Sequence, residues 1–189
     1  MKPILLFSFF LSSVCLSAQD YPAIRRQLVE LKTADQHYRL ILDSLFRKEK
    51  LDWKDPRIQR WIPEAQRQDS ITLAAVRKIL DQHGWLGMDQ IGEEGNETLF
   101  LVIQHADSAT MAHYFPMLAQ SYILGKTPAQ SYALMLDRLL TDRGQPQVYG
   151  TQIGLDRKPF PIADPSGLDE RRKKMGLPAM SEYLKMMGG

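Results

Sequence analysis

Thr98-Leu-Phe-Leu-Val-Ile-Gln-His-Ala-Asp107 is apolar from Leu99 to Ile103 and ends in the polar residues Gln104, His105 and Asp107. In a helix, which turns by about 100° per residue, the apolar side chains of this stretch cover both sides and leave no clean solvent-facing surface. The pattern therefore predicts a central helix. A polar group buried there without a partner costs about 1–3 kcal/mol, so we expect other polar side chains to gather around these three residues.

The chain before this stretch is also patterned as helices. Residues 21–47 carry apolar side chains at steps of three and four, as expected of a long amphipathic helix, but Asp35 occupies one core-facing position. A buried carboxylate needs a proton, a cation or hydrogen bonds, and Arg39 is a cation four residues further on. The two residues form either a pair on the helix surface or part of a site. A second helix is expected to begin at Pro56 and to break or kink at Pro63.

The chain after the central helix predicts more helices and then a change of structure. Asp107 is expected to cap the next helix, and another helix follows it. Residues 147–153 then alternate in polarity, which is typical of a β-strand. Residues 158–162 contain two prolines, so they can form only an edge strand of a sheet. These features predict a two-stranded β-ribbon within residues 145–163, followed by two short helices. The expected fold is mainly α, a single-domain helical bundle with a small C-terminal β-ribbon.

Residues 1–18 are typical of a secretory signal peptide. They contain one positive residue, Lys2, then an apolar run, and small residues lead up to the expected cleavage after Ala18. The apolar run is too short to favour the alternative, a retained membrane span. Cys15 leaves a lipoprotein as a minor alternative. We therefore expect an exported protein, periplasmic or secreted, whose single domain covers residues 19–189 and contains no disulfide because Cys15 is the only cysteine.

The composition argues against several classes of partner. The formal net charge is only +2, and the one basic run, residues 171–174, has no aromatic residues interleaved with it, so nucleic-acid binding is not expected. None of the four histidines repeats at the spacing of a zinc-binding helix, and we expect no metal and no cofactor. A metal held by His105 and distant carboxylates is the remaining alternative. The chain also lacks the Gly-x-Ser-x-Gly motif of serine hydrolases.

Several short motifs together resemble a bacterial family that is catalogued only as a domain of unknown function. The motifs are Asp35-Gln36, His83-Gly84-Trp85, Gln104-His105-Ala106-Asp107, Asp137-Arg138, Gln147-x-Tyr149-Gly150-Thr151-Gln152 and Asp169-Glu170-Arg171-Arg172. The likeness covers nearly all of the chain after the predicted signal peptide, although Leu86 stands where members of that family often have proline. The resemblance implies the extent of the domain and the motifs that matter. It implies no reaction and no catalytic residues.

The polar residues define a candidate site around His105. An imidazole held by a carboxylate such as Asp35 or Asp137 can transfer protons near neutral pH. Arg138 or Arg171, together with the Tyr149 hydroxyl, can bind an anionic or polar substrate. The candidate catalytic residues are His105, Asp35 and Tyr149, and the candidate ligand-binding residues are Gln104, Asp107, Arg138, Gln147, Gln152 and Arg171. The competing interpretation is that these groups only satisfy one another's hydrogen bonds.

Two functions follow from these alternatives. The first is an exported enzyme, a hydrolase or lyase that acts on a small polar or cell-envelope molecule with His105 as general acid or base. The second is a non-catalytic periplasmic binding or interaction module whose polar cluster is structural. Both require polar side chains from distant parts of the chain to surround His105. A ring on the open surface, or one with only hydrocarbon neighbours, would rule out the site.

Overall fold

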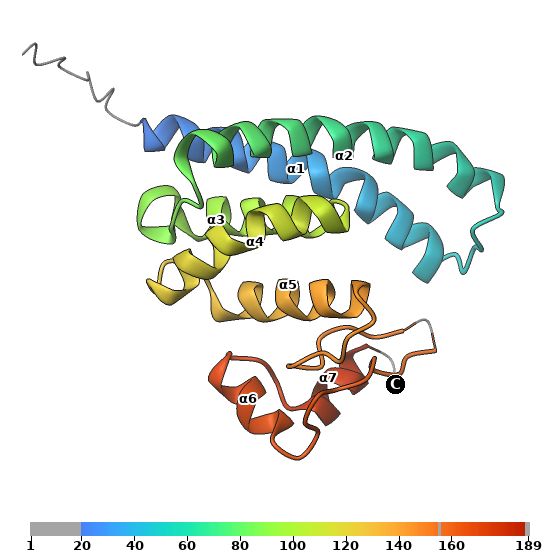
Figure 1. Ribbon diagram of the computed structural model, residues 1–189. Helices are drawn as coiled ribbons and strands as arrows, with labels where there is room; N and C mark the ends of the chain where they lie inside the picture. The colour runs from blue at the N-terminus through green and yellow to red at the C-terminus, as the bar shows by residue number, and fades with distance from the viewer. Residues whose placement is uncertain (1–19, 155, 188–189) are drawn as a thin grey trace, which may run out of the picture.

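The computed structural model describes residues 20–154 and 156–187, and this part of the chain forms seven helices (Figure 1). They are α1 (Tyr21–Arg47), α2 (Pro56–His83), α3 (Met88–Gln104), α4 (Ser108–Ile123), α5 (Ala129–Asp142), α6 (Leu168–Lys174) and α7 (Met180–Met186). None of these helices has both the length and the apolar character needed to cross a membrane. The predicted signal peptide, residues 1–18, lies outside the described residues.

The first three helices form one layer of the molecule. α1 and α2 run antiparallel to each other, and α3 lies against both of them (Figure 1). Leu28 of α1, Leu80 of α2 and Leu99 of α3 are fully buried in their shared core. Because α3 also contacts α4 and α5, the prediction of a central helix is confirmed.

The helix α2 continues through Pro63, so the predicted break at this residue does not occur. Asp55 caps the start of α2 by accepting a hydrogen bond from the backbone N–H of Arg57. Pro63 has no N–H to complete the hydrogen bond to the carbonyl one turn earlier. It is exposed, so water can satisfy that carbonyl, and the helix persists because its later turns pack on α1 and α3.

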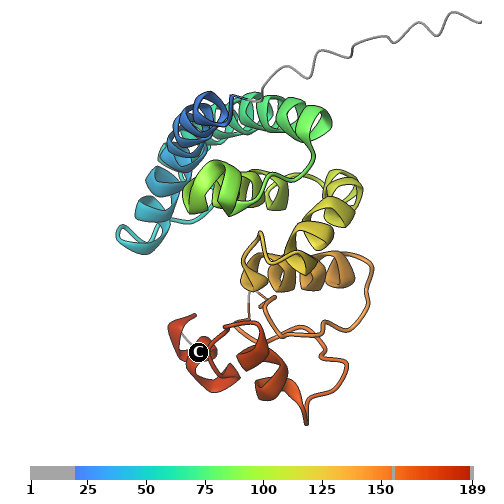
Figure 2. The same cartoon turned by 90° about the vertical axis from the view of Figure 1, so that its left-hand side faces the viewer.

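A second layer is formed by α4 and α5, and the C-terminal segment covers the far side of α5 (Figures 1 and 2). The rings of Tyr122 on α4 and Tyr132 on α5 stack with their centroids 4.6 Å apart. The C-terminal segment, residues 144–187, contains α6, α7 and a long irregular stretch that precedes them. The irregular stretch is the region where the sequence predicts a ribbon.

The predicted C-terminal β-ribbon is wrong. Within the described residues of this stretch, the only ladder-type pairs are two isolated bridges, Gln147 with Ile162 and Ile153 with Pro159. The backbone N–H groups that would pair in a strand instead donate to a side chain on α5. The Asp137 carboxylate accepts hydrogen bonds from three of them between residues 148 and 151. Gly150, with φ +68°, also leaves the extended conformation. The segment is therefore an irregular loop clamped by side chains.

Candidate functional site

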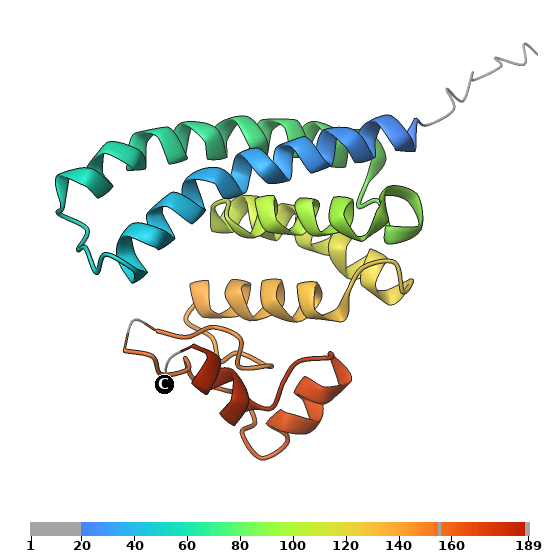
Figure 3. The same cartoon turned by 180° about the vertical axis from the view of Figure 1, so that it is seen from behind.

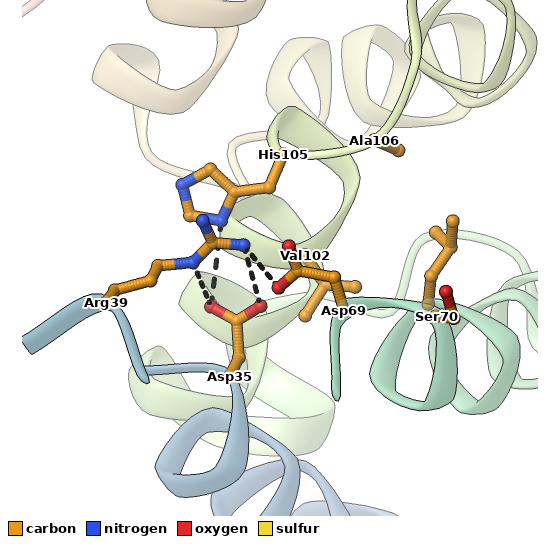
Figure 4. A pocket seen from close by; sticks show the side chains of 8 residues that line it. Asp35, Arg39, Asp69, Ser70, Val102, His105 and Ala106 are labelled. Carbon is orange, nitrogen blue, oxygen red and sulfur yellow. Dashed lines mark hydrogen bonds and ion pairs between the residues drawn. The ribbon is translucent and has the colours of Figure 1, made fainter. Parts of the chain in front are cut away.

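Four ionisable side chains from three helices converge beside the end of α3 (Figure 4). Asp35 and Arg39 lie one turn apart on α1, Asp69 comes from α2, and His105 directly follows α3. Arg39 joins the two carboxylates, because its Nη2 lies 2.7 Å from Asp69 Oδ1 and 3.4 Å from Asp35 Oδ1. Its Nε lies 3.3 Å from Asp35 Oδ2. The cluster thus connects all three helices of the first layer.

Asp35 is the buried centre of the cluster, with only 2% of its side chain exposed. Its core-facing position is confirmed, and its pair with Arg39 is not an exposed surface pair. Gln36 donates a further hydrogen bond of 2.7 Å to Asp35 Oδ2. Burial raises the pKa of the Asp35 carboxyl, but His105 and the Arg39 guanidinium outweigh burial and hold that pKa below its ordinary value. Asp35 is therefore ionised at neutral pH.

His105 turns its buried ring nitrogen towards Asp35. Nδ1 lies 3.6 Å from Asp35 Oδ2, just beyond hydrogen-bond length, and has no hydrogen-bond partner among the described residues. The other nitrogen, Nε2, points away from the carboxylate in Figure 4, and 24% of the side chain is exposed. A slight rotation of the ring would let Nδ1–H donate to Asp35, which fixes the tautomer that leaves Nε2 as proton acceptor.

A small cavity opens beside this cluster. Its volume is about 90 Å³, and its lining consists of the four ionisable residues with Ser70, Leu73, Val102 and Ala106. Sites for whole small molecules usually enclose about 300–1,000 Å³. The cavity therefore admits a few water molecules or one end of a larger ligand. Two carboxylates face one guanidinium there, so with a neutral imidazole the surplus charge is negative and favours a neutral or cationic group.

The predicted site does not form as one unit, because Asp137 anchors a separate network. Asp137 is fully buried on α5. Its carboxylate accepts hydrogen bonds from the backbone N–H groups of Val148, Tyr149 and Thr151 at 2.7–3.0 Å, and from the Thr151 hydroxyl at 2.9 Å. Of the two carboxylates considered as partners of His105, the structure places Asp35 beside the ring and commits Asp137 to this loop.

Two arginines of α6 bind the other side of the same loop. The fully buried Arg172 donates through Nη1 to the carbonyls of Tyr149 at 2.7 Å and Gly150 at 3.2 Å, and Arg171 donates to the carbonyl of Val148 at 3.1 Å. The Arg172 guanidinium also lies 4.8 Å from the ring centroid of Tyr183. Side chains thus bind the N–H groups of Val148 and Tyr149 and the carbonyls of residues 148–150, so Arg171 has a structural role here.

Arg138 links the two polar groups. Its Nη1 donates a hydrogen bond of 2.7 Å to the backbone carbonyl of Gln104, and its Nε donates one of 3.2 Å to Gln152 Oε1. Gln147 in turn accepts from the backbone N–H of Gln152 at 2.9 Å and donates to the Phe160 carbonyl. Gln104, Arg138, Gln147 and Gln152 therefore form a path from the end of α3 to the C-terminal segment, and none of them lines the cavity beside His105.

Tyr149 and Asp107 also lie outside that cavity lining. Burial raises the pKa of the Tyr149 phenol, as do the neighbouring rings of Tyr132 and Tyr122, so the phenol stays protonated at neutral pH. Asp107 caps α4, as predicted, and accepts a hydrogen bond of 2.8 Å from the backbone N–H of Thr110. Neither residue is brought against His105 in the way the candidate site requires.

Asp69 is the site residue that the sequence reasoning missed. It lies four residues before Leu73, so it continues the apolar stripe of α2 that includes Leu73, Val76 and Leu80. Asp35 stands out for the same reason, as a carboxylate in an apolar series. The same pattern, a carboxylate at an apolar position of a helix, identifies Asp69 in α2 as well.

The arrangement of the cluster does not suit a metal ion. In residues 20–154 and 156–187, no three His, Cys, Asp or Glu side chains are placed to hold a metal together. The Arg39 guanidinium lies between Asp35 and Asp69, where a cation bound by both carboxylates would have to lie (Figure 4).

No curated protein and no solved structure is significantly similar to this chain. One family model, described as a family of unknown function (DUF6624), matches residues 22–189. This range includes both the cluster around Asp35 and the loop held by Asp137, and it confirms the resemblance to a family without an assigned activity. The chain belongs to the family of unknown function DUF6624.

Proposed function

We propose that this protein is an exported enzyme of the hydrolase or lyase type in which His105, oriented by Asp35, performs general acid–base catalysis. The observation that carries the proposal is the approach of His105 Nδ1 to within 3.6 Å of a buried, ionised carboxylate while Nε2 points away from it (Figure 4). A carboxylate in this position orients an imidazole and stabilises its protonated form.

In the proposed reaction, His105 Nε2 accepts a proton from a water molecule or from the substrate and later returns it to the leaving group. Asp35 stays ionised throughout, because the pKa of its carboxyl is held low, and it offsets the positive charge that the ring acquires. The Asp69 side chain is 41% exposed, and its Oδ2 can orient a polar donor of the substrate. Arg39 keeps both carboxylates in place.

The size and charge of the cavity indicate the kind of group that reacts. A volume of about 90 Å³ admits only one end of a substrate, and the surplus negative charge favours a neutral or cationic polar group. A small polar molecule or an exposed end of a cell-envelope component has this chemistry. An anionic group at the reacting end does not fit.

The test compares His105→Gln with His113→Gln in a screen of ester, amide, glycoside and lyase substrates. His113 is exposed on α4 and serves as the matched control. Because general acid–base catalysis contributes about 10²–10⁴-fold, we expect His105→Gln to lower kcat by at least about 100-fold and His113→Gln to retain full activity. Both variants should melt at nearly the temperature of the unaltered protein.

Two results would overturn the proposal. One is activity that persists in His105→Gln, since another group must then transfer the proton. The other is a large loss of stability in His105→Gln together with no turnover by the unaltered protein in any substrate class. That second result favours a structural role for the ring.

The alternative function is a periplasmic binding or interaction module with a structural polar cluster. The small cavity favours it, as does the use of Asp137, Arg171 and Gln147 in holding the C-terminal loop. If this alternative holds, His105→Ala and Asp35→Ala should each cost several kcal/mol, because each leaves buried polar groups unpaired. Thermal and urea unfolding of His105→Ala separates the two functions, because the buried Asp35 is expected to stabilise the fold under either one.

Export rests on the sequence of residues 1–18. When the full chain is produced in a bacterium, we expect it in the periplasm or medium, with a mature N-terminus at Gln19. Full-length protein in the cytoplasm would contradict this part of the proposal.

A further inference from the structure

The cavity beside His105 has a lining that selects one chemical class of substrate. All of its lining residues fall between residues 35 and 106, an interval that the structure describes without a gap. Figures 1 and 3 view the molecule from opposite sides, and both show α1 and α2 extending beyond the end of α3. The cavity lies at that end, beside the middle of α1 and α2, so no further turn of α3 covers it.

The charges in the lining leave one carboxylate oxygen unpaired. With a neutral imidazole, Arg39 is the only cation of the lining, and it is shared by Asp35 and Asp69. Its Nε and Nη2 bind Asp35, and Nη2 also binds Asp69 Oδ1 at 2.7 Å. The other oxygen of Asp69, Oδ2, has no hydrogen-bond or ion-pair partner among the described residues (Figure 4). The surplus negative charge of the cavity therefore has a free oxygen on a side chain that is 41% exposed.

The neighbouring hydroxyl also offers an acceptor. Ser70 follows Asp69 on α2, is exposed, and donates its proton to the backbone carbonyl of Gln66 at 2.9 Å, so its oxygen keeps only lone pairs for a ligand. Nη1 of Arg39 keeps its donors free, but the two carboxylates already offset the charge of this guanidinium. A positively charged hydrogen-bond donor matches this arrangement, and an ammonium group provides three N–H donors on one charged atom.

The rest of the lining is apolar and suits a short hydrocarbon stem. Leu73 comes from α2, Val102 from the last turn of α3, and Ala106 from the turn that follows α3. These side chains provide a surface for the methylene groups next to an ammonium group. Because the volume is only about 90 Å³, the remainder of a larger substrate stays outside the cavity.

We propose that the substrate of this site carries a primary ammonium group on a short alkyl stem, and that Asp69 Oδ2 binds this group. The assignment rests on the proposed function, because a bound amine is a substrate only if His105 transfers protons beside it. Asp69 then determines specificity, whereas Asp35 orients the imidazole. A substrate with a carboxylate at the same end is disfavoured, since that carboxylate would face Asp35 and Asp69.

The binding test uses three probes of similar size, propylammonium, propionamide and propionate, with the mature chain at neutral pH. Methyl chemical shifts of Leu73 and Val102 locate each probe, because both residues line the cavity. We expect propylammonium to bind more tightly than propionamide, and propionate to cause no shift. The preference for propylammonium should shrink at high salt, because the charge that it meets is partly exposed.

Asp69→Asn removes the charge but keeps an oxygen that can accept from Arg39, so we expect the variant to fold. It should weaken propylammonium binding by about fivefold and leave propionamide binding unchanged. Asp43→Asn is the matched control, because Asp43 is an exposed aspartate that also pairs with an arginine but lies outside the lining. It should leave the binding of all three probes unchanged.

Three results would overturn the proposal. They are equal binding of propylammonium and propionamide, equal effects of Asp69→Asn and Asp43→Asn, and the same methyl shifts with potassium chloride at equal concentration. The third would mean that the cavity holds any small cation.

Turnover separates the substrate class from the proposed function. His105→Gln should still bind propylammonium, since Asp69 and not the imidazole pairs with the ammonium group. If propylammonium binds as expected but no amine is turned over, the ammonium site stands and the enzymatic function fails. If substrates without an amine are turned over with the same kcat/KM as their amine-bearing counterparts, the enzymatic function stands and the substrate class is wrong.

Discussion

At the scale of single residues, Asp35 determines the chemistry of the candidate site because it is buried and yet ionised. The pKa of its carboxyl is raised by burial and lowered by a larger amount by His105 and Arg39. A lowered pKa in the folded state means that the ionised carboxylate contributes stability above its unfolded pKa, near 3.8. That contribution is lost as the pH falls through the lower pKa that the carboxyl has in the folded state.

Asp35→Asn tests this balance. At pH 7 we expect a loss of about 1–3 kcal/mol in the free energy of unfolding, because Arg39 and Gln36 lose a charged acceptor. The difference from the unaltered protein should stay constant above about pH 4 and shrink at lower pH. Urea unfolding between pH 2 and pH 7 measures it.

Asp43→Asn is the matched control for Asp35→Asn, since Asp43 also lies on α1 and pairs with an arginine four residues later. Its side chain is 54% exposed, so the loss should stay within about 1 kcal/mol. Equal losses of stability at pH 7 would mean that the buried Asp35 stabilises the fold no more than the exposed Asp43 does.

The sequence predicted the buried carboxylate of α1 but only part of its surroundings. Asp35 is recognisable because it interrupts an apolar series, and His105 because it ends an apolar helix. Which carboxylate faces His105 depends on how helices pack, and the sequence named Asp35 as a candidate but left Asp137 open as well. The packing of α1 against α3 places Asp35 there.

At the scale of elements, the helices followed their apolar periodicity, whereas the C-terminal loop did not follow its alternation of polarity. A strand pattern predicts backbone pairing only when the backbone groups are free to pair. Here the Asp137 carboxylate accepts hydrogen bonds from backbone N–H groups of the loop, and Arg172 donates hydrogen bonds to two of its carbonyls. Pro159 and Pro161 have no N–H group to pair. Those side chains come from α5 and α6, so no local pattern in residues 147–162 could predict them.

Asp137→Asn tests the clamp on this loop. The amide has one fewer acceptor oxygen and directs its N–H groups at the donors of the loop, so we expect a loss of at least about 2 kcal/mol in the free energy of unfolding. Asp142→Asn, at the exposed end of α5, should change stability by less than about 0.5 kcal/mol. Chemical denaturation of both variants makes the comparison. Equal losses would mean that the clamp is not stabilising.

At the scale of the whole molecule, the helices α1–α3 carry the candidate catalytic cluster, and the segment beyond α5 carries the clamped loop. Arg138 connects them through the carbonyl of Gln104, which directly precedes His105, and through Gln152 in the loop. This connection fixes the end of α3 from outside the cavity. The two polar groups that the sequence suggested as one site are therefore two sites joined by one side chain.

Arg138→Met removes this connection while keeping the length of the apolar stem. We expect faster amide hydrogen exchange at residues 147–152 and at the last turn of α3, because both lose a fixed partner. Arg143→Met changes the same residue type at the exposed end of α5 and should leave exchange in both regions unchanged. Faster exchange in the loop alone would mean that α3 holds His105 without help from the C-terminal segment. The coupling of the two layers would then not reach the candidate catalytic cluster.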